Sequence, residues 1–426
     1  MKKIVGIIAA AALATSAFAE VNVGSWNRGV FVPFHFDGDT LRSFEGPSWE
    51  VGKKGGIRTG LSFSASSENA GVAFDIHGNP GAAIGIGDNA YAYVKPVDML
   101  TIKFGKIDNN LGRLDHCYGT WDYARFNNIE RGEGLADVKR QNGLGAVFTL
   151  EPVEGLIIDY EANFDTTNGD NHAYDVLWES SSTLIGYKAD FGFIRAIING
   201  QQAQKYKPSD TDTKPAAIIG LAADINAVEN LSLKFGASIP TNLTSGEAEY
   251  TYKAYDATKY TRDDWVFNPE TGTYKLTDAA KEKKGAITGT KNVNAIKAAV
   301  AADYHLDALA IHGQFGLDVM PKSFDTDGAK LGAMGINAGV GLDYAFTDVW
   351  KLVTDFRFQS WTAVKADGSD LKYEDPAFGG YLGLQQQLTN ATFAFGAQFG
   401  VRSMETATGK EDNFTFAVPL TITASF

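Results

Sequence analysis

Apolar and polar positions alternate along the last segment of the chain, residues 414–426. Every even position there is apolar, from Phe414 to Phe426, and the odd positions are small or polar, mostly Thr and Ser. Because successive side chains of a strand point to opposite faces, the segment is predicted to be a strand with one apolar and one polar face. A half-buried strand of a soluble sandwich would show the same pattern, so the assignment depends on what precedes it.

The same two-residue period recurs upstream. Around Trp350 the apolar side chains alternate with a polar set that includes Lys351, Asp355 and Arg357. Charged side chains on an inner face are very unfavourable in a dry core unless they are paired, but they are natural in a water-filled lumen. Further segments with this period lie at 156–164, 231–239, 309–318 and 392–402.

The connections between these segments alternate in length. Short turns are expected at 67–70, 96–99, 151–155, 188–190, 227–230, 305–308, 347–348 and 389–391. Longer polar segments lie between them, at 37–47, 78–87, 107–141, 165–175, 204–214, 241–292, 320–332, 362–376 and 403–412. This alternation is typical of a transmembrane barrel with short periplasmic turns and long outer loops.

The predicted fold is therefore all-β: one antiparallel up-and-down transmembrane barrel covering residues 20–426. Eight short turns and nine long segments join 18 strands and leave both termini on the periplasmic side. Sixteen strands remain possible, because the segments 21–36 and 176–189 alternate poorly. The mature chain has no Pro- or Ser-rich linker and no shift in composition, so it is expected to form a single domain.

The N-terminus has the layout of a secretory signal peptide. Lys2 and Lys3 make a basic start, an apolar run follows from Ile4 to Leu13, and Ala17-Phe18-Ala19 is a small-x-small cleavage site. The apolar run is shorter than the roughly 20 residues that a membrane-spanning helix needs. We expect residues 1–19 to be removed on export.

Charge and the remaining chemistry exclude several classes of protein. The chain has a net charge of −13, which becomes −15 without the two lysines of the signal. Such a balance disfavours nucleic acid as a partner. Cys117 is the only cysteine, so no intrachain disulfide can form. The six histidines show no HExxH spacing and no Gly-x-Ser-x-Gly motif is present, so no enzyme activity, metal or cofactor is expected.

Three features resemble Gram-negative outer-membrane porins. The stretch 101–115 resembles their fifth strand and the loop that follows it, and 140–147 looks like the strand that leaves that loop. Phe426 matches their terminal aromatic residue. The resemblance implies a channel in the outer membrane of a diderm bacterium, a third outer loop folded into the barrel, homotrimers, and recognition of Phe426 by the insertion machinery. An 18-strand barrel is more similar to the substrate-selective sugar or carboxylate channels than to the 16-strand porins.

The resemblance implies that the segment 107–141 narrows the pore. A charged loop opposite an oppositely charged wall creates a transverse field that favours polar solutes. The residues expected to set the constriction and its selectivity are Arg113, Asp115, Glu130, Arg131, Glu133, Lys103 and Arg357. Further residues expected on the lumen wall are Arg58, Lys234, Lys297, Lys351, Asp355 and Arg402.

The sequence thus predicts a passive diffusion channel for small polar or charged solutes, with outer-membrane lipid and those solutes as its partners. Two alternatives remain: a substrate-selective channel for sugars or oligosaccharides, and a plugged barrel that acts as a surface adhesin or scaffold. Lumen aromatics would support the first, and Trp361 and Tyr381 are its candidates. The long outer loop 241–292 is rich in Tyr and is expected either to form a hairpin with its turn at Asn268–Gly272 or to bind sugars. Preference for cations or anions stays open.

Overall fold

The chain was studied as a computed structural model. The model describes residues 20–37, 40–45, 57–78, 84–115, 135–140, 143–163, 178–204, 214–241, 249–252, 265–268, 273–276, 287–291, 295–326, 329–364, 370–406 and 409–426. The expected signal peptide, residues 1–19, lies outside these ranges.

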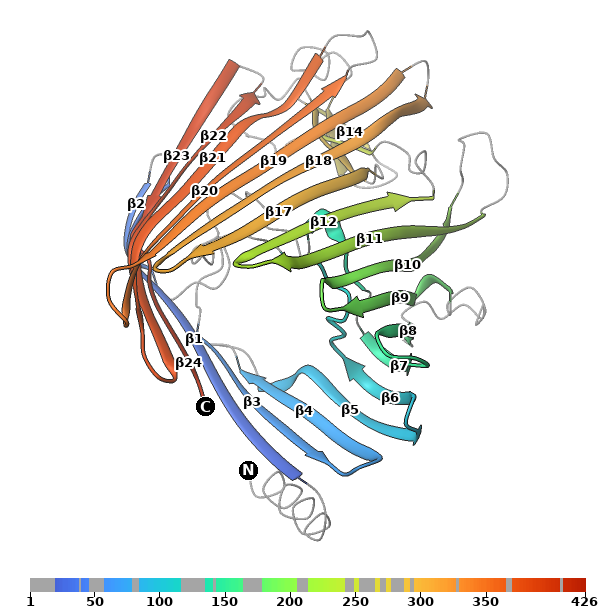
Figure 1. Ribbon diagram of the computed structural model, residues 1–426. Coiled ribbons are helices and arrows are strands. Elements are labelled where there is room, and N and C mark those ends of the chain that lie inside the picture. Colours follow the sequence, from blue (N-terminus) through green and yellow to red (C-terminus); the bar gives the residue numbers. More distant parts are fainter. Residues whose placement is uncertain are drawn as a thin grey trace.

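The described strands form one large antiparallel sheet that closes into a barrel (Figure 1). Its strands are β1 (Glu20–Asp37), β2 (Thr40–Glu45), β3 (Ile57–Ser66), β4 (Ala70–Gly78), β5 (Gly85–Val97), β6 (Leu100–Ile107), β7 (Gly143–Leu150), β8 (Leu156–Asn163), β9 (Ser181–Ala189), β10 (Gly192–Gln204), β11 (Lys214–Val228), β12 (Leu231–Pro240), β17 (Ile296–Leu306), β18 (Leu309–Thr326), β19 (Ala329–Ala345), β20 (Trp350–Val364), β21 (Asp370–Gln387), β22 (Ala391–Thr406), β23 (Gly409–Ala417) and β24 (Leu420–Ser425).

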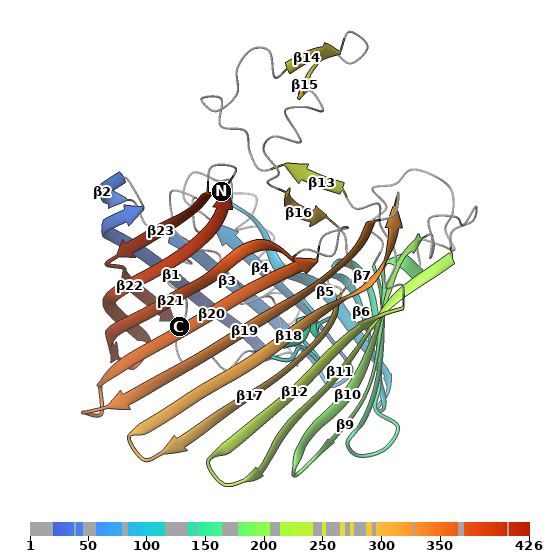
Figure 2. The same ribbon diagram turned by 90° about the horizontal axis from the view of Figure 1, so that it is seen from above.

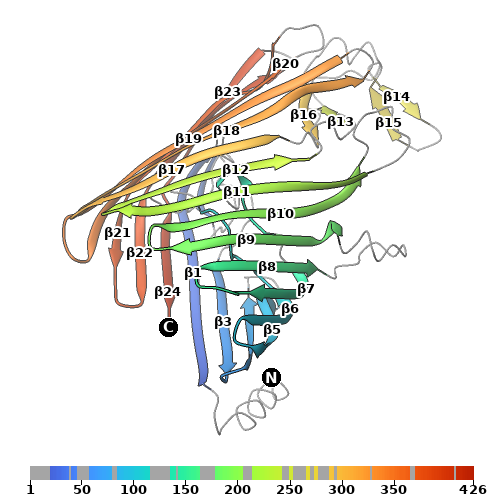
Figure 3. The ribbon, with the colours of Figure 1, turned by 45° about the vertical axis from the view of Figure 1, so that its right-hand side comes forward.

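These 20 segments make 18 barrel strands. β2 and β3 follow one another along one edge of β1, and β23 and β24 do so along its other edge. Each remaining strand pairs with its neighbours in chain order, as the run from β6 to β12 shows in Figure 3. The all-β fold and the expected count of 18 are confirmed.

The barrel closes where the first and last described strands meet. Ser25 and Phe426 exchange two backbone hydrogen bonds, each with an N–O distance of 2.8 Å. The register continues upward through Trp26 opposite Ser425 and Gly29 opposite Ile422. The alternating C-terminal strand is therefore paired on both sides and is not an edge strand. Closure of the sheet leaves no row of unpaired backbone N–H and C=O groups.

Short turns gather at one end of the barrel, and the small strands β13 to β16 lie beyond the other end (Figure 2). Asn230 and Asp307 occupy the left-handed backbone region in two of these turns, with φ of 62° and 47°. Asn and Asp tolerate this conformation better than other non-glycine residues. The short turns expected between the strands are confirmed.

Several segments expected to be long loops are largely strand. Part of 37–47 forms β2, and most of 320–332 belongs to β18 and β19. Strand pairing also runs into 362–376 and 403–412. These extensions lie past the end of the apolar alternation. Backbone pairing between the strands therefore continues beyond the residues that keep the apolar period.

The two faces of the barrel differ as the alternation predicts. Exposed large apolar side chains mark the outer face, among them Phe315, Val340 and Phe356. Polar side chains of the opposite parity, such as Gln314 and Asp355, are buried on the inner face. None of the helices among the described residues is long and apolar enough to span a membrane.

The segment 21–36 alternates poorly because β1 changes phase. Val21 and Val23 are exposed at odd positions, whereas Phe34 is exposed at an even one. Between them Val30 and Val32 are buried. A single two-residue period therefore cannot describe the whole strand.

Two small two-stranded sheets lie within 241–292. β13 (Glu249–Tyr252) pairs with β16 (Ile287–Lys291), and β14 (Trp265–Asn268) pairs with β15 (Thr273–Leu276). Asn268 lies opposite Thr273, so the expected hairpin at Asn268–Gly272 is confirmed.

Candidate functional site

The described ends of the segment 107–141 lie against the inner side of the barrel wall. We call residues 108–115 and 135–140 the inner segment; it includes the short 3₁₀ helix η2 (Leu135–Asp137), beside β12 and β17 (Figure 1). Its two limbs touch one another: the Leu114 N–H donates to the Val138 carbonyl at 3.0 Å, and the Leu135 N–H donates to the Leu114 carbonyl at 2.6 Å. Leu114 and Leu135, which flank the undescribed residues 116–134, are therefore joined by a hydrogen bond.

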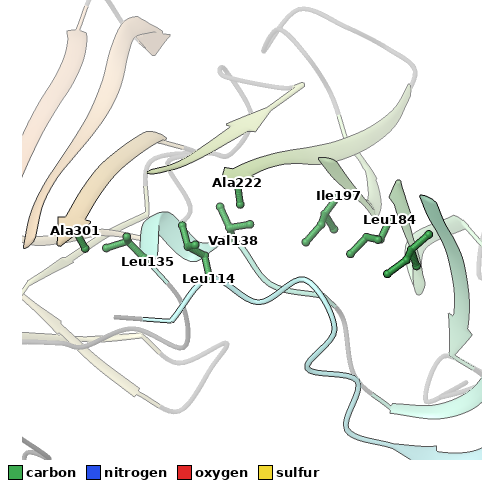
Figure 4. Packing of buried hydrophobic residues seen from close by; sticks show 8 residues of the cluster. Leu114, Leu135, Val138, Leu184, Ile197, Ala222 and Ala301 are labelled. Atoms are coloured by element: carbon green, nitrogen blue, oxygen red, sulfur yellow. The ribbon is translucent and has the colours of Figure 1, made fainter. Parts of the chain in front are cut away.

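Apolar side chains hold the inner segment to the wall. Leu114, Leu135 and Val138 are almost fully buried in one cluster (Figure 4). The wall side of that cluster consists of Ile157, Leu184, Ile197, Ala222 and Ala301, from β8, β9, β10, β11 and β17. The only large apolar cluster on the described inner face is thus the one that this segment covers.

Arg195 of β10 holds the first limb through backbone carbonyls. Its Nε donates to the Gly112 carbonyl at 2.8 Å, and its Nη2 donates to the Arg113 carbonyl at 2.9 Å. Its Nη1 lies 2.5 Å from an Asp224 carboxylate oxygen. A guanidinium with these partners fixes the position of the loop backbone, because its donors lie in one rigid plane.

Arg140 holds the second limb. Its guanidinium is buried, with Nη1 2.5 Å from Asp159, Nε 3.6 Å from Glu161, and Nη2 donating to the Ser182 carbonyl at 2.7 Å. Burial lowers the pKa of Arg140, and the charges of Asp159 and Glu161 oppose that shift. Asn109 of the first limb donates to Glu161 at 3.3 Å, so both limbs meet at the same pair of carboxylates on β8.

A third contact joins η2 to β17. Asp137 forms an ion pair with Lys297, one of the residues expected on the lumen wall. Among the residues that the sequence assigned to the constriction, Arg113 and Asp115 contact each other. Arg113 donates to Asp115 at 2.8 Å, and both side chains remain exposed to solvent. Glu130, Arg131 and Glu133 lie outside the described residues.

Lys103 and Arg357 lie on different strands and contact different groups. Lys103 of β6 lies over the Tyr91 ring, 5.3 Å from its centroid. Arg357 of β20 is buried and its Nε donates to Asp355 at 3.0 Å, on the same face of the same strand. The structure does not bring Lys103 and Arg357 into contact with one another.

Two expected wall residues on the C-terminal half form partly exposed ion pairs. Lys351 donates to Asp343 at 2.9 Å, and Lys234 lies 4.0 Å from Asp303. His312 joins them, with Nδ1 2.5 Å from Asp303 and Nε2 4.0 Å from Asp343. Arg402 lies in β22, where its backbone is opposite Ala377 and Asn413. The cationic side chains described on this wall are therefore largely neutralised by neighbouring carboxylates.

Sequence analysis missed a second group on the inner wall. Arg58, which it did expect there, lies with Trp26, Arg28, His77 and Asp88 from β1, β4 and β5. We call these five residues the Trp26 cluster. Trp26 and Arg28 lie in the segment whose alternation is interrupted, so parity could not assign them to the lumen. The anchoring roles of Arg140 and Arg195 were missed because their partners are 19 or more residues away along the chain.

Within the described ranges, no group of three His, Cys, Asp or Glu side chains is arranged to hold a metal ion. The charged side chains of the inner wall can form ion pairs and hydrogen bonds with polar or charged groups.

Comparison with protein-family models and with curated proteins finds no match. Among solved structures, the chain is similar to OmpT, an outer membrane protein of Vibrio cholerae, at 13% identity and a TM-score of 0.47, covering 96% of this chain and 98% of that one. It is also similar to the outer membrane channel DcaP of Acinetobacter baumannii, at 11% identity and a TM-score of 0.44, with 96% and 98% covered. An anion-selective porin from Comamonas acidovorans matches at 9% identity and a TM-score of 0.42, with 96% and 100% covered.

Proposed function

We propose that this protein is an outer-membrane porin, a passive diffusion channel for small polar or charged solutes. The observation that carries the proposal is the closed 18-strand barrel with an apolar outer face and a charged inner face. Apolar side chains exposed all round a sheet need lipid or another apolar cover. Charged side chains on the inner face need water or counter-charges, and a water-filled lumen supplies both.

The inner segment supports a constriction within this channel. Three separate contacts, at Arg195, Arg140 and Lys297, hold it to the wall together with an apolar cluster. A segment fixed in this way reduces the open cross-section beside β8 to β12. In this proposal Arg113, Asp115 and the expected Glu130, Arg131 and Glu133 face the pore, opposite the cations of the β1–β6 wall, including Lys103.

The remaining partners follow from this function. The apolar outer face contacts outer-membrane lipid, small hydrophilic solutes pass through the lumen, and no cofactor takes part. The signal peptide directs export, and the terminal Phe426, whose ring is exposed, is available to the insertion machinery. A homotrimer would cover part of the outer face.

Planar-bilayer recording of the refolded protein tests the channel. We expect ohmic conductance with a reversal potential that shifts in a salt gradient. A folded barrel that gives no conductance would overturn the proposal and favour a plugged adhesin or scaffold.

The constriction is tested by replacing residues 116–134 with a short Gly-Ser linker. Leu114 and Leu135 are already hydrogen-bonded, so the linker closes the gap and leaves the anchoring contacts in place. We expect larger conductance and weaker ion selectivity. The matched control replaces 253–286, whose flanking residues Tyr252 and Ile287 are paired. This control should leave conductance and ion selectivity unchanged. Unchanged conductance and selectivity after replacement of 116–134 would contradict the proposed constriction.

A further inference from the structure

The Trp26 cluster places two like charges directly opposite one another. Arg28 of β1 and Arg58 of β3 are register partners in the antiparallel pair, so their side chains lie on the same face. Like charges in this position destabilise a sheet. Both guanidinium groups lie over the same indole, 5.4 Å and 5.5 Å from the Trp26 centroid. The ring therefore holds two cations close together.

A missing side chain makes room for the indole. Trp26 lies across Gly60, where an added Cβ would come within 2.3 Å of the ring. His77, opposite Gly60 on β4, closes the far side with its ring edge-on to Trp26 at 5.1 Å. The indole is consequently confined between Gly60, His77 and the two arginines.

His77 orients one arginine without neutralising it. The distance from Arg58 Nη2 to His77 Nδ1 is 3.0 Å. Arginine does not lose its proton in proteins, so it must be the donor, and His77 accepts as a neutral ring protonated on Nε2. Asp88 lies 3.5 Å from Arg58 on the same side. Arg58 is thereby held in place by His77 and Asp88, and its side chain stays partly exposed.

The cluster is less deeply buried than two other lumen cations, Arg357 and Arg140. The Arg58 and Asp88 side chains are 29% and 50% exposed, whereas Arg357 is 7% exposed and Arg140 is fully buried. Along the same wall, Lys103 lies over Tyr91, and the Tyr93 ring lies flat across Gly71. The β1–β6 wall thus presents cations and aromatic rings side by side, with Asp88 as the carboxylate paired to Arg58.

We propose that this wall binds organic anions that carry a flat apolar ring, with the Trp26 cluster as the principal site; the proposal rests on the channel function above. A carboxylate or phosphate accepts hydrogen bonds from the two guanidinium groups, whose paired N–H donors match planar oxyanions. The ring of the solute contacts the edge of the partly exposed Trp26 ring and packs beside Tyr91, so that it binds more tightly than a small anion such as acetate. Binding of the anion also relieves the repulsion between Arg28 and Arg58.

The test is block of single-channel current by benzoate compared with acetate, which carries the same charge. We expect benzoate to block at a concentration about tenfold lower, the scale of one aromatic contact. Trp26→Leu should remove the advantage of benzoate and leave acetate unaffected. Arg28→Gln with Arg58→Gln should weaken block by both anions and shift the permeability ratio towards cations.

Lys351→Gln is the matched control, since it removes a lumen cation from a neutralised pair. It should leave benzoate block unchanged. Equal block by benzoate and acetate in the native channel would overturn this inference while leaving the channel intact, and absence of any conductance would overturn the channel itself. If the double variant fails to fold, Arg58→Lys, which keeps the charge but loses the planar edge, should still weaken benzoate block.

Discussion

At the scale of single residues, a buried ion pair between Arg140 and the carboxylates of β8 fixes the position of the inner segment. Arg140 contacts two carboxylates of β8 that are themselves buried, and its burial is made tolerable by both of them. Removing one partner from such a group leaves an uncompensated charge, which costs far more than losing an exposed pair. Asn109 of the first limb donates to Glu161, one of the same two carboxylates. Replacing Arg140 should therefore affect both limbs of the inner segment.

Arg140→Met is expected to destabilise the folded barrel by about 3–5 kcal/mol, because Asp159 and Glu161 would remain buried without their cation. Urea unfolding in lipid vesicles measures the loss, and current noise should rise as the inner segment loosens. Lys351→Met, in a more exposed pair, is the control and should cost roughly 1 kcal/mol or less. Adding Asp159→Asn and Glu161→Gln to Arg140→Met should recover part of the stability; no recovery would contradict the charge argument.

Gly60→Ala tests whether the position of the Trp26 ring above Gly60 is needed for binding. A Cβ at this position would lie 2.3 Å from the indole, so the ring must move away from the two arginines. We expect benzoate block to fall to the level of acetate while the barrel stays folded. Gly313→Ala provides the control, since the nearest atom there is a carbonyl oxygen at 4.0 Å. Unchanged benzoate block in Gly60→Ala would argue against a role for the indole.

At the scale of elements, each strand carries two environments that differ by one residue. On β12, Phe235 is exposed on the outer face, whereas Ser232 and Lys234 share the inner parity. Ser232 lies opposite Asp303 of β17, and Lys234 approaches the same carboxylate. A charge placed on this strand should therefore have opposite consequences at positions of opposite parity.

Phe235→Lys should destabilise the protein by about 2–4 kcal/mol, the cost of a lysine at the lipid face near the bilayer midplane. Ser232→Lys, on the inner face beside Asp303, should cost much less. Unfolding in vesicles of defined lipid compares the two variants directly. Equal losses would mean that the outer face of β12 does not meet lipid.

At the scale of the whole molecule, closure of the barrel depends on residues from the first and last described strands. β1 pairs with β24 through Ser25 and Phe426, and β23 continues the seam. A barrel has no free edge only when this seam forms, so folding must bring together strands separated by almost the whole sequence.

Removing Phe426 is expected to slow assembly, because it deletes two backbone hydrogen bonds of the seam as well as the terminal ring. Refolding into liposomes isolates the seam, and the yield of heat-resistant barrel in outer membranes adds the insertion machinery. Phe426→Ala keeps the backbone contacts and should refold normally in liposomes but assemble poorly in cells. Normal assembly of Phe426→Ala in cells would exclude a role for the ring.

What the sequence determined by itself is the local environment of each strand. A strand between lipid and water must alternate, and turns must be short at one end, so the amino-acid pattern predicted an 18-strand barrel and placed Lys234, Lys351 and Arg357 on the inner face. The pattern underestimated the length of strands such as β18 and β19, because backbone pairing continues past the residues that keep the apolar period.

Only the tertiary structure decided which charges meet. Arg140 finds its carboxylates 19 and 21 positions later along the chain, Arg195 reaches the backbone of Gly112, and Arg28 faces Arg58 through the register of β1 and β3. Such pairings depend on strand register and barrel closure, which are set by contacts distributed over the whole sheet. The alternation along the chain predicts which face of the barrel wall a residue lies on. Its charged partner on another strand depends on the tertiary structure.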